Sequence, residues 1–190
     1  SRVAVGDFPD GWNTDAAAEV VTVANKEGKW LKIAKQGGFY PEMIKNIPEN
    51  MTLEFYVQTG SKNHPAPLVL NLTHLRKPQE FRNYTYHVAW KGQHAIQFHF
   101  WPGTQTNAGK ASSEVMAGKG NIPLIKNKTS FTSWNNFNNT TAHVALWRQG
   151  TRLRVYVNGE KVWDLPRAFD ADTMLSPLVC QGALKAMNII

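Results

Sequence analysis

The chain has 190 residues, of which 42% are hydrophobic and 18% are charged, a composition that is typical of a folded globular protein and excludes a disordered one. Its formal net charge of +7 favours anionic partners such as acidic glycans, lipopolysaccharide or nucleic acid, although no nucleic-acid-binding motif is present. No run of 18 or more apolar residues and no signal-peptide core occurs, so we expect membrane association only through parts of the protein outside this chain. Because the chain starts at Ser1 without Met, we expect a fragment of a longer protein. The single cysteine, Cys180, excludes an internal disulfide.

The first part of the chain is expected to form short strands separated by turns. In order, the expected elements are a turn-rich opening (1–13), two strands (20–23 and 30–34) around a turn (25–29), a break (37–41), a helical turn (41–46) and a strand (53–58). Within the last of these, Leu53, Phe55 and Val57 alternate with polar residues, which predicts one face toward the core.

The middle of the chain continues the strand pattern. The expected elements are a loop (60–67), a strand (68–74), a hairpin of two strands (85–90 and 95–101) around 91–94, a loop (102–110), a short strand (112–117) and a long irregular region rich in Asn, Thr and Ser (121–141).

Residues 141–165 carry the clearest pattern, with three strands in succession at 143–148, 152–157 and 160–165. Asn158-Gly159 between alternating runs is a strong hairpin signal, because both central residues of a type I′ turn require a positive φ. A link containing Pro166 and one final apolar strand within 178–190 complete the chain.

About ten to thirteen short strands, with turn signals at roughly 8–12-residue spacing, predict an all-β fold. We expect residues 1–190 to form a single antiparallel β-sandwich, a concanavalin A-like jelly roll.

The block H-V-A-L-W-R-Q-G-x-R-L-R-V-Y-V-N-G-E-K-V (143–162) resembles the paired late strands of laminin-G-like and concanavalin A-like domains. Four further segments resemble the N-terminal concanavalin A-like domain of some OmpA-family proteins of Gram-negative bacteria: G-D-F-P-x-G-W-N-T (6–14), G-K-W-L-K-I (28–33), P-E-N-M-T-L-E-F (48–55) and V-W-D-L-P-R-A-F (162–169). The resemblance implies an exported module of the cell envelope, in the periplasm or at the outer membrane surface, which binds glycan or an envelope protein.

A glycan site requires an aromatic surface for sugar rings and a few directional polar groups. Strand alternation supplies such a set, which we predict to lie on one face: Tyr56, Asn71, His87, Gln97, His99 and Trp101.

Two enzymatic functions are alternatives to this binding role. The strand carboxylates Glu54, Glu114, Glu160 and Asp164 lack the pairing of a retaining glycosidase, apart from Glu160 and Asp164, which we expect at strand ends. Gln97-Phe98-His99 resembles the Q-x-H of polyuronate lyases, whose Gln and His lie beside the uronate, with Tyr56, Tyr84 or Tyr86 as acid or base and Arg82 on the carboxylate. The companion motifs of that family are missing.

The six histidines show no metal-binding spacing, and Asp170 and Asp172 fall short of the ligands that calcium requires, so we expect neither metal nor cofactor. The sequence therefore predicts a non-catalytic glycan- or protein-binding module, with a polyuronate lyase or a purely structural domain as alternatives, and it does not indicate an oligomeric state.

Overall fold

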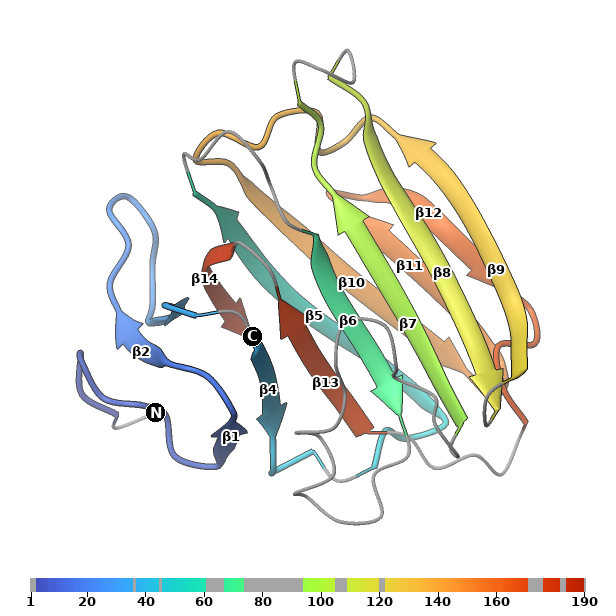
Figure 1. Ribbon diagram of the computed structural model, residues 1–190, viewed down its shortest axis with the longest axis horizontal. Coiled ribbons are helices and arrows are strands. Elements are labelled where there is room, and N and C mark those ends of the chain that lie inside the picture. Colours follow the sequence, from blue (N-terminus) through green and yellow to red (C-terminus); the bar gives the residue numbers. More distant parts are fainter. Residues whose placement is uncertain are drawn as a thin grey trace.

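The chain folds as a two-layered β-sandwich in the computed structural model (Figure 1). The structure describes residues 3–35, 37–44, 46–60, 67–73, 94–104, 109–119, 122–170, 176–181 and 184–189. These residues form fourteen strands in two antiparallel sheets of seven, and none of them forms a helix long and apolar enough to cross a membrane. The predicted all-β jelly-roll class is confirmed.

Sheet A has the strand order β1-β4-β13-β6-β7-β8-β9. Its strands are β1 (Trp12–Thr14), β4 (Gly37–Pro41), β13 (Ser176–Gln181), β6 (Leu68–Thr73), β7 (His94–Trp101), β8 (Ala111–Lys119) and β9 (Ile122–Phe131).

Sheet B has the strand order β12-β11-β10-β5-β14-β3-β2. Its strands are β12 (Glu160–Leu165), β11 (Arg152–Val157), β10 (Thr141–Gln149), β5 (Asn50–Thr59), β14 (Leu184–Ile189), β3 (Trp30–Ile33) and β2 (Ala18–Val21).

The core lies between the two sheets and is built by the alternation read from the sequence. Sheet B contributes Val155 from β11 and Phe55 from β5, and sheet A contributes Phe98 from β7, each at most 1% exposed. Burying such a side chain contributes roughly 1.5–3 kcal/mol to the free energy of folding. The inward row therefore fixes which residues of each strand face outward.

The three late strands are confirmed as β10, β11 and β12, paired in sequence order. Asn158 and Gly159 have φ values of 48° and 81°, as the predicted turn requires. Leu153, Val155 and Val157 are completely buried, whereas Arg152, Arg154 and Tyr156 lie on the outer face of sheet B.

The predicted break at 37–41 is wrong, because this segment is strand β4 between β1 and β13. Its glycines serve close packing rather than chain reversal. A Cβ built on Gly37 would lie 2.4 Å from the Ala16 Cβ atom, and the Gly38 amide donates to the Asp15 carboxylate at 2.7 Å. Phe39 is fully buried, so the strand anchors this end of sheet A.

The irregular region predicted at 121–141 is also largely wrong, since 122–131 forms strand β9 at the edge of sheet A. A register shift at Ala117/Gly118 opposite Pro123 and the exposed Lys126 and Lys128 are devices that protect an edge strand from further pairing. The polar, solvated composition of this edge strand is close to that of a loop. Its sequence therefore shows no clear alternation of apolar and polar residues.

Two further pairings differ from expectation. Strand β7 pairs with β6 and β8 along its two edges instead of forming the predicted hairpin, whose other half, 85–90, lies outside the described residues. The single strand expected within 178–190 is two strands, and β13 and β14 lie in the interior of different sheets (Figure 1).

Candidate functional site

The outer face of sheet A carries a group of polar residues on four neighbouring strands, β6 to β9. Asn71 of β6 lies opposite Gln97 of β7, and His99 of β7 lies opposite Glu114 of β8. Glu114 in turn lies opposite Lys128 of β9. Because Ile96, Phe98 and Phe100 of β7 enter the core, the intervening Gln97, His99 and Trp101 share the outer face.

Asn71, Gln97 and His99 form a hydrogen-bonded row. The Gln97 Nε2 atom donates to the Asn71 Oδ1 atom at 2.8 Å, and the His99 Nε2 and Gln97 Oε1 atoms are 2.7 Å apart. Since a glutamine oxygen only accepts, His99 Nε2 carries the proton in this arrangement. The row thus fixes the position of the imidazole ring.

The row is buried, although it points away from the sandwich core. Asn71 and Gln97 are 0% exposed and His99 is 2% exposed, and Val69 and Thr73 on the same face of β6 are also buried. These residues lie on the outer face of sheet A, as the alternation predicts, but at β6 and β7 they are buried on that face as well.

One donor of the row has no acceptor. The Asn71 Nδ2 atom is buried and makes no hydrogen bond. An unsatisfied buried amide costs about 1–3 kcal/mol, so such groups are rare in folded proteins.

The accessible end of the row is Trp101. Its ring centroid is 5.4 Å from that of His99, and the Lys128 Nζ atom lies 5.8 Å from the Trp101 ring centroid. Trp101 and Glu114 are half-buried and Lys128 is exposed, so an aromatic ring, a carboxylate and an ammonium group are accessible together. We call these three residues the Trp101 surface.

Of the six residues predicted to share a face, four lie together: Asn71, Gln97, His99 and Trp101. Tyr56 does not, because it belongs to β5 on the outer face of sheet B, where its ring lies 4.9 Å from that of His143. His87 lies outside the described residues, as do Arg82, Tyr84 and Tyr86. The alternation of single strands assigns a residue to a face but not to a sheet.

Neither Lys128 nor Glu114 belongs to the predicted glycan site, and Glu114 is predicted only as a strand carboxylate without a partner. Both belong to the site because β8 and β9 pair in register. The sequence gives no signal for this pairing once 122–131 is taken for a loop.

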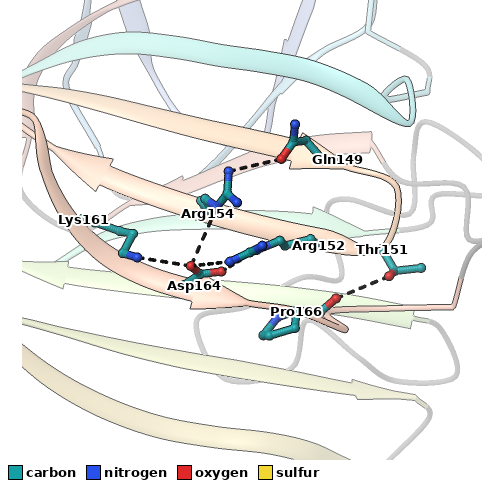
Figure 2. A network of polar contacts seen from close by, with 7 residues as sticks. All are labelled: Gln149, Thr151, Arg152, Arg154, Lys161, Asp164 and Pro166. Carbon is teal, nitrogen blue, oxygen red and sulfur yellow. Dashed lines mark hydrogen bonds and ion pairs between the residues drawn. The ribbon is translucent and has the colours of Figure 1, made fainter.

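The other strand carboxylates have structural partners. The Glu160 carboxylate accepts hydrogen bonds from the Thr132 and Ser133 amides at 3.0 and 2.8 Å, which hold the pKa of Glu160 below its ordinary value. Arg152 donates to Asp164 through two nitrogens, each at 2.8 Å, and these bonds hold the pKa of Asp164 well below its usual range (Figure 2). Neither carboxylate is arranged as a general acid.

The described residues contain no group of three or more His, Cys, Asp or Glu side chains placed to hold a metal ion. Asp170 ends one described segment, and Asp172 lies outside it.

No protein-family profile matches the chain, and no curated protein is similar to it in sequence. Solved structures do match its fold. A family 16 glycoside hydrolase endo-glucanase from Bacteroides ovatus aligns over 97% of both chains with a TM-score of 0.59 and 11% identity. The Emp46p carbohydrate recognition domain aligns over 94% of this chain and 87% of its own with a TM-score of 0.58 and 9% identity. The alginate lyase Aly36B aligns over 84% and 79% with a TM-score of 0.54 and 12% identity.

These structures include both a carbohydrate recognition domain and enzymes, at identities that establish the fold alone. The chain thus has the concanavalin A-like jelly-roll fold.

Proposed function

We propose that this protein is a non-catalytic carbohydrate-binding module and that its glycan binds at the Trp101 surface of sheet A. The observation that carries the proposal is the half-exposed Trp101 ring, positioned beside His99 and Lys128. A half-exposed indole offers an apolar face to a sugar ring, and Glu114 and Lys128 supply an acceptor and donors for hydroxyl groups.

The buried row serves this surface as a support. Asn71 holds Gln97, Gln97 holds His99, and the His99 ring lies against Trp101. A side chain locked by such neighbours loses little conformational entropy on binding, which raises affinity. The likeness of the fold to a carbohydrate recognition domain is in keeping with this role.

The proposal is tested with a glycan array that spans neutral and acidic polysaccharides, followed by isothermal titration of each ligand found. We expect Trp101→Ala to weaken binding by about tenfold or more, because a buried aromatic contact of this kind is worth on the order of 1.4 kcal/mol. Tyr56→Ala is the matched control, since Tyr56 is an exposed aromatic residue of β5 on the opposite sheet. Unchanged affinity in Trp101→Ala, or no ligand among the glycans at millimolar concentration, would contradict the proposal; in the latter case a protein ligand of the envelope is the remaining binding role.

A polyuronate lyase that uses Gln97 and His99 is the enzymatic alternative, motivated by the 2.7 Å contact between them and by a fold shared with an alginate lyase. His99 is 2% exposed, so a uronate has no access to its ring in this arrangement. The alternative predicts growth of the ultraviolet absorbance of an unsaturated product on alginate or pectin, and its loss in His99→Ala. Activity unchanged in His99→Ala would exclude this mechanism.

A purely structural role is the third candidate, and it accounts for the burial of Gln97 and His99 without a ligand. It predicts that Asn71→Leu, which removes the unpartnered Nδ2 donor but also the acceptor of Gln97 Nε2, changes only the free energy of unfolding and leaves glycan binding unchanged. A glycan whose affinity falls in Asn71→Leu would instead favour the binding role.

We further propose that the protein is exported to the periplasm or outer membrane surface as part of an OmpA-family protein. The support is the resemblance of the segments at 6–14, 28–33, 48–55 and 162–169. The sequence of the full-length gene tests this directly: a C-terminal OmpA-type module is expected, and a cytoplasmic protein without export signal would contradict it.

A further inference from the structure

The outer face of sheet B carries a compact cluster of cations around one carboxylate (Figure 2). Asp164 of β12 accepts hydrogen bonds from Arg152 at 2.8 Å and from Lys161 at 3.2 Å, and the Arg154 Nε atom lies 3.7 Å from the Asp164 Oδ2 atom. Three cations share a single anion, so the cluster keeps two positive charges in excess. We call Arg152, Arg154, Lys161 and Asp164 the Asp164 cluster.

Among the described residues, Asp164 is the one acid that forms ion pairs with these three cations. The two oxygens of Asp164 are occupied by Arg152 and Lys161, and Arg152 keeps the pKa of Asp164 well below its usual range, so the carboxylate stays ionised at neutral pH. Each guanidinium has five N–H groups and each ammonium three, so donors remain for a second anion. The side chains of Arg152 and Lys161 are 42% and 53% exposed, which leaves those donors accessible.

Aromatic surface adjoins the cluster on the neighbouring strands. Trp147 of β10 lies opposite Arg154, is 41% exposed, and has the Arg154 guanidinium 5.1 Å from its ring centroid. Tyr156 of β11 lies opposite Ala145, two residues from Trp147 on β10. Gln149 fixes Arg154 through a hydrogen bond at 3.1 Å.

We propose that the outer face of sheet B is a second binding surface, which takes an acidic glycan by stacking a sugar ring on Trp147 and pairing its sulfate or carboxylate groups with Arg154, Lys161 and Arg152. Arginine pairs with carboxylate and sulfate-like oxygens through its planar fork, and an arginine already stacked on an indole is oriented for this. The cluster spans only two strands, β11 and β12. A surface of this extent fits one or two anionic groups on a neutral sugar ring better than the long row of phosphates of a nucleic-acid backbone. The surface lies on the other side of the sandwich from Trp101, so it is independent of the function proposed above.

The test compares binding of chondroitin sulfate fragments, desulfated chondroitin and a neutral β-glucan of matched length by isothermal titration at two salt concentrations. We expect the acidic glycans to bind and the neutral one not, with affinity that falls as salt rises. Binding of desulfated chondroitin at equal strength assigns the contact to carboxylates, and its loss assigns the contact to sulfates. Equal binding of the neutral glycan, or no binding of either acidic glycan, overturns the proposal.

The decisive variants are Arg154→Gln/Lys161→Gln and Trp147→Ala, both of which leave the Arg152–Asp164 pair intact. Each is expected to weaken binding of chondroitin sulfate by about tenfold. The matched control is Lys26→Gln/Lys35→Gln, which removes the same charge from exposed positions elsewhere. Equal loss in the control means that net charge alone attracts the ligand, and equal affinity for a DNA oligonucleotide means that the surface selects polyanions and not glycans; either result refutes the assignment. Melting temperatures confirm that the variants are folded.

Discussion

Asn158 shows how much one residue at a hairpin tip determines. Its φ is 48°, its Oδ1 atom accepts the His143 amide at 2.8 Å, and its Nδ2 atom donates to the Ser133 carbonyl at 2.6 Å. The residue therefore shapes the turn and also joins β10 to the segment that follows β9.

These two roles are separable by substitution. Asn158→Gly keeps the positive φ and loses both side-chain bonds, whereas Asn158→Ala also acquires the left-handed strain of about 1–2 kcal/mol. We expect the free energy of unfolding, measured by urea denaturation, to be lower in Asn158→Ala than in Asn158→Gly by about 1 kcal/mol. Equal values would mean that the turn relaxes at no cost.

Arg148 is a buried cation with a structural role. It is 2% exposed, donates to the Ile47 carbonyl at 2.7 Å and the Gly150 carbonyl at 3.1 Å, and lies 4.6 Å from the centroid of the Phe169 ring. Burial lowers the pKa of this guanidinium, and the nearby Glu49 opposes that effect.

Arg148→Met keeps the length of the side chain and removes its donors. Because the Ile47 carbonyl loses its partner, we expect the free energy of unfolding to fall by about 2–3 kcal/mol in guanidinium denaturation. Arg148→Lys should recover part of this loss, since it retains one donor group but not the planar fork. A Met variant as stable as the parent would show that packing on Phe169 is the whole contribution.

At the scale of elements, Glu160 connects the edges of the two sheets. It begins β12 of sheet B and accepts hydrogen bonds from Thr132 and Ser133, directly after β9 of sheet A. The Ser133 hydroxyl returns a bond to the Val157 carbonyl at 2.6 Å.

This connection predicts a pH dependence. The pKa values of Glu160 and Asp164 are lowered in the folded state, so their contribution is present above the unfolded-state values and is lost as the pH falls through the folded-state values. We expect the melting temperature to fall as the pH drops below about 4.5, and to fall less steeply in Glu160→Gln. Glu27→Gln is the control at an exposed glutamate, and identical acid profiles for the two variants would contradict the role of Glu160.

Whether a strand could be predicted from the sequence depends on how differently its two faces are buried. The segment 152–157 has one dry and one wet face, and its two-residue period predicts both the strand and its orientation. Strand β4 and strand β9 lack this contrast: the first is built on glycines that pack closely, and the second is a polar edge. The two-residue period of apolar residues therefore could not identify either strand.

The candidate site was predictable only in part for a related reason. Gln97, His99 and Trp101 lie two residues apart on one strand, so the alternation groups them correctly. Tyr56 has the same alternation on β5 but belongs to the other sheet, and no pattern within one strand encodes the sheet to which it pairs. The burial of Gln97 and His99 is likewise a property of what covers the sheet, not of the strand itself.

At the scale of the whole molecule, the chain places different chemistry on the two sides of one sandwich. The outer face of sheet A holds a buried row of neutral polar residues beside the partly exposed Trp101, Glu114 and Lys128, and that of sheet B holds exposed arginine, lysine and tryptophan side chains. Part of the net charge of +7 is therefore concentrated on one local surface of sheet B, at the Asp164 cluster.

The order of the strands also determines when the protein can fold during its synthesis. Strand β13 joins β4 to β6 in sheet A, and β14 joins β5 to β3 in sheet B, yet both follow the other twelve strands in the sequence. A nascent chain that ends before residue 176 has neither sheet continuous, so we expect it to remain sensitive to protease on a stalled ribosome. Protection should appear only when 176–189 has left the exit tunnel, and resistance in a chain stalled earlier would contradict this. A sandwich organised in this way cannot complete either sheet until residues 176–189 are available, so chaperones or an export machinery can hold the earlier segments extended until then.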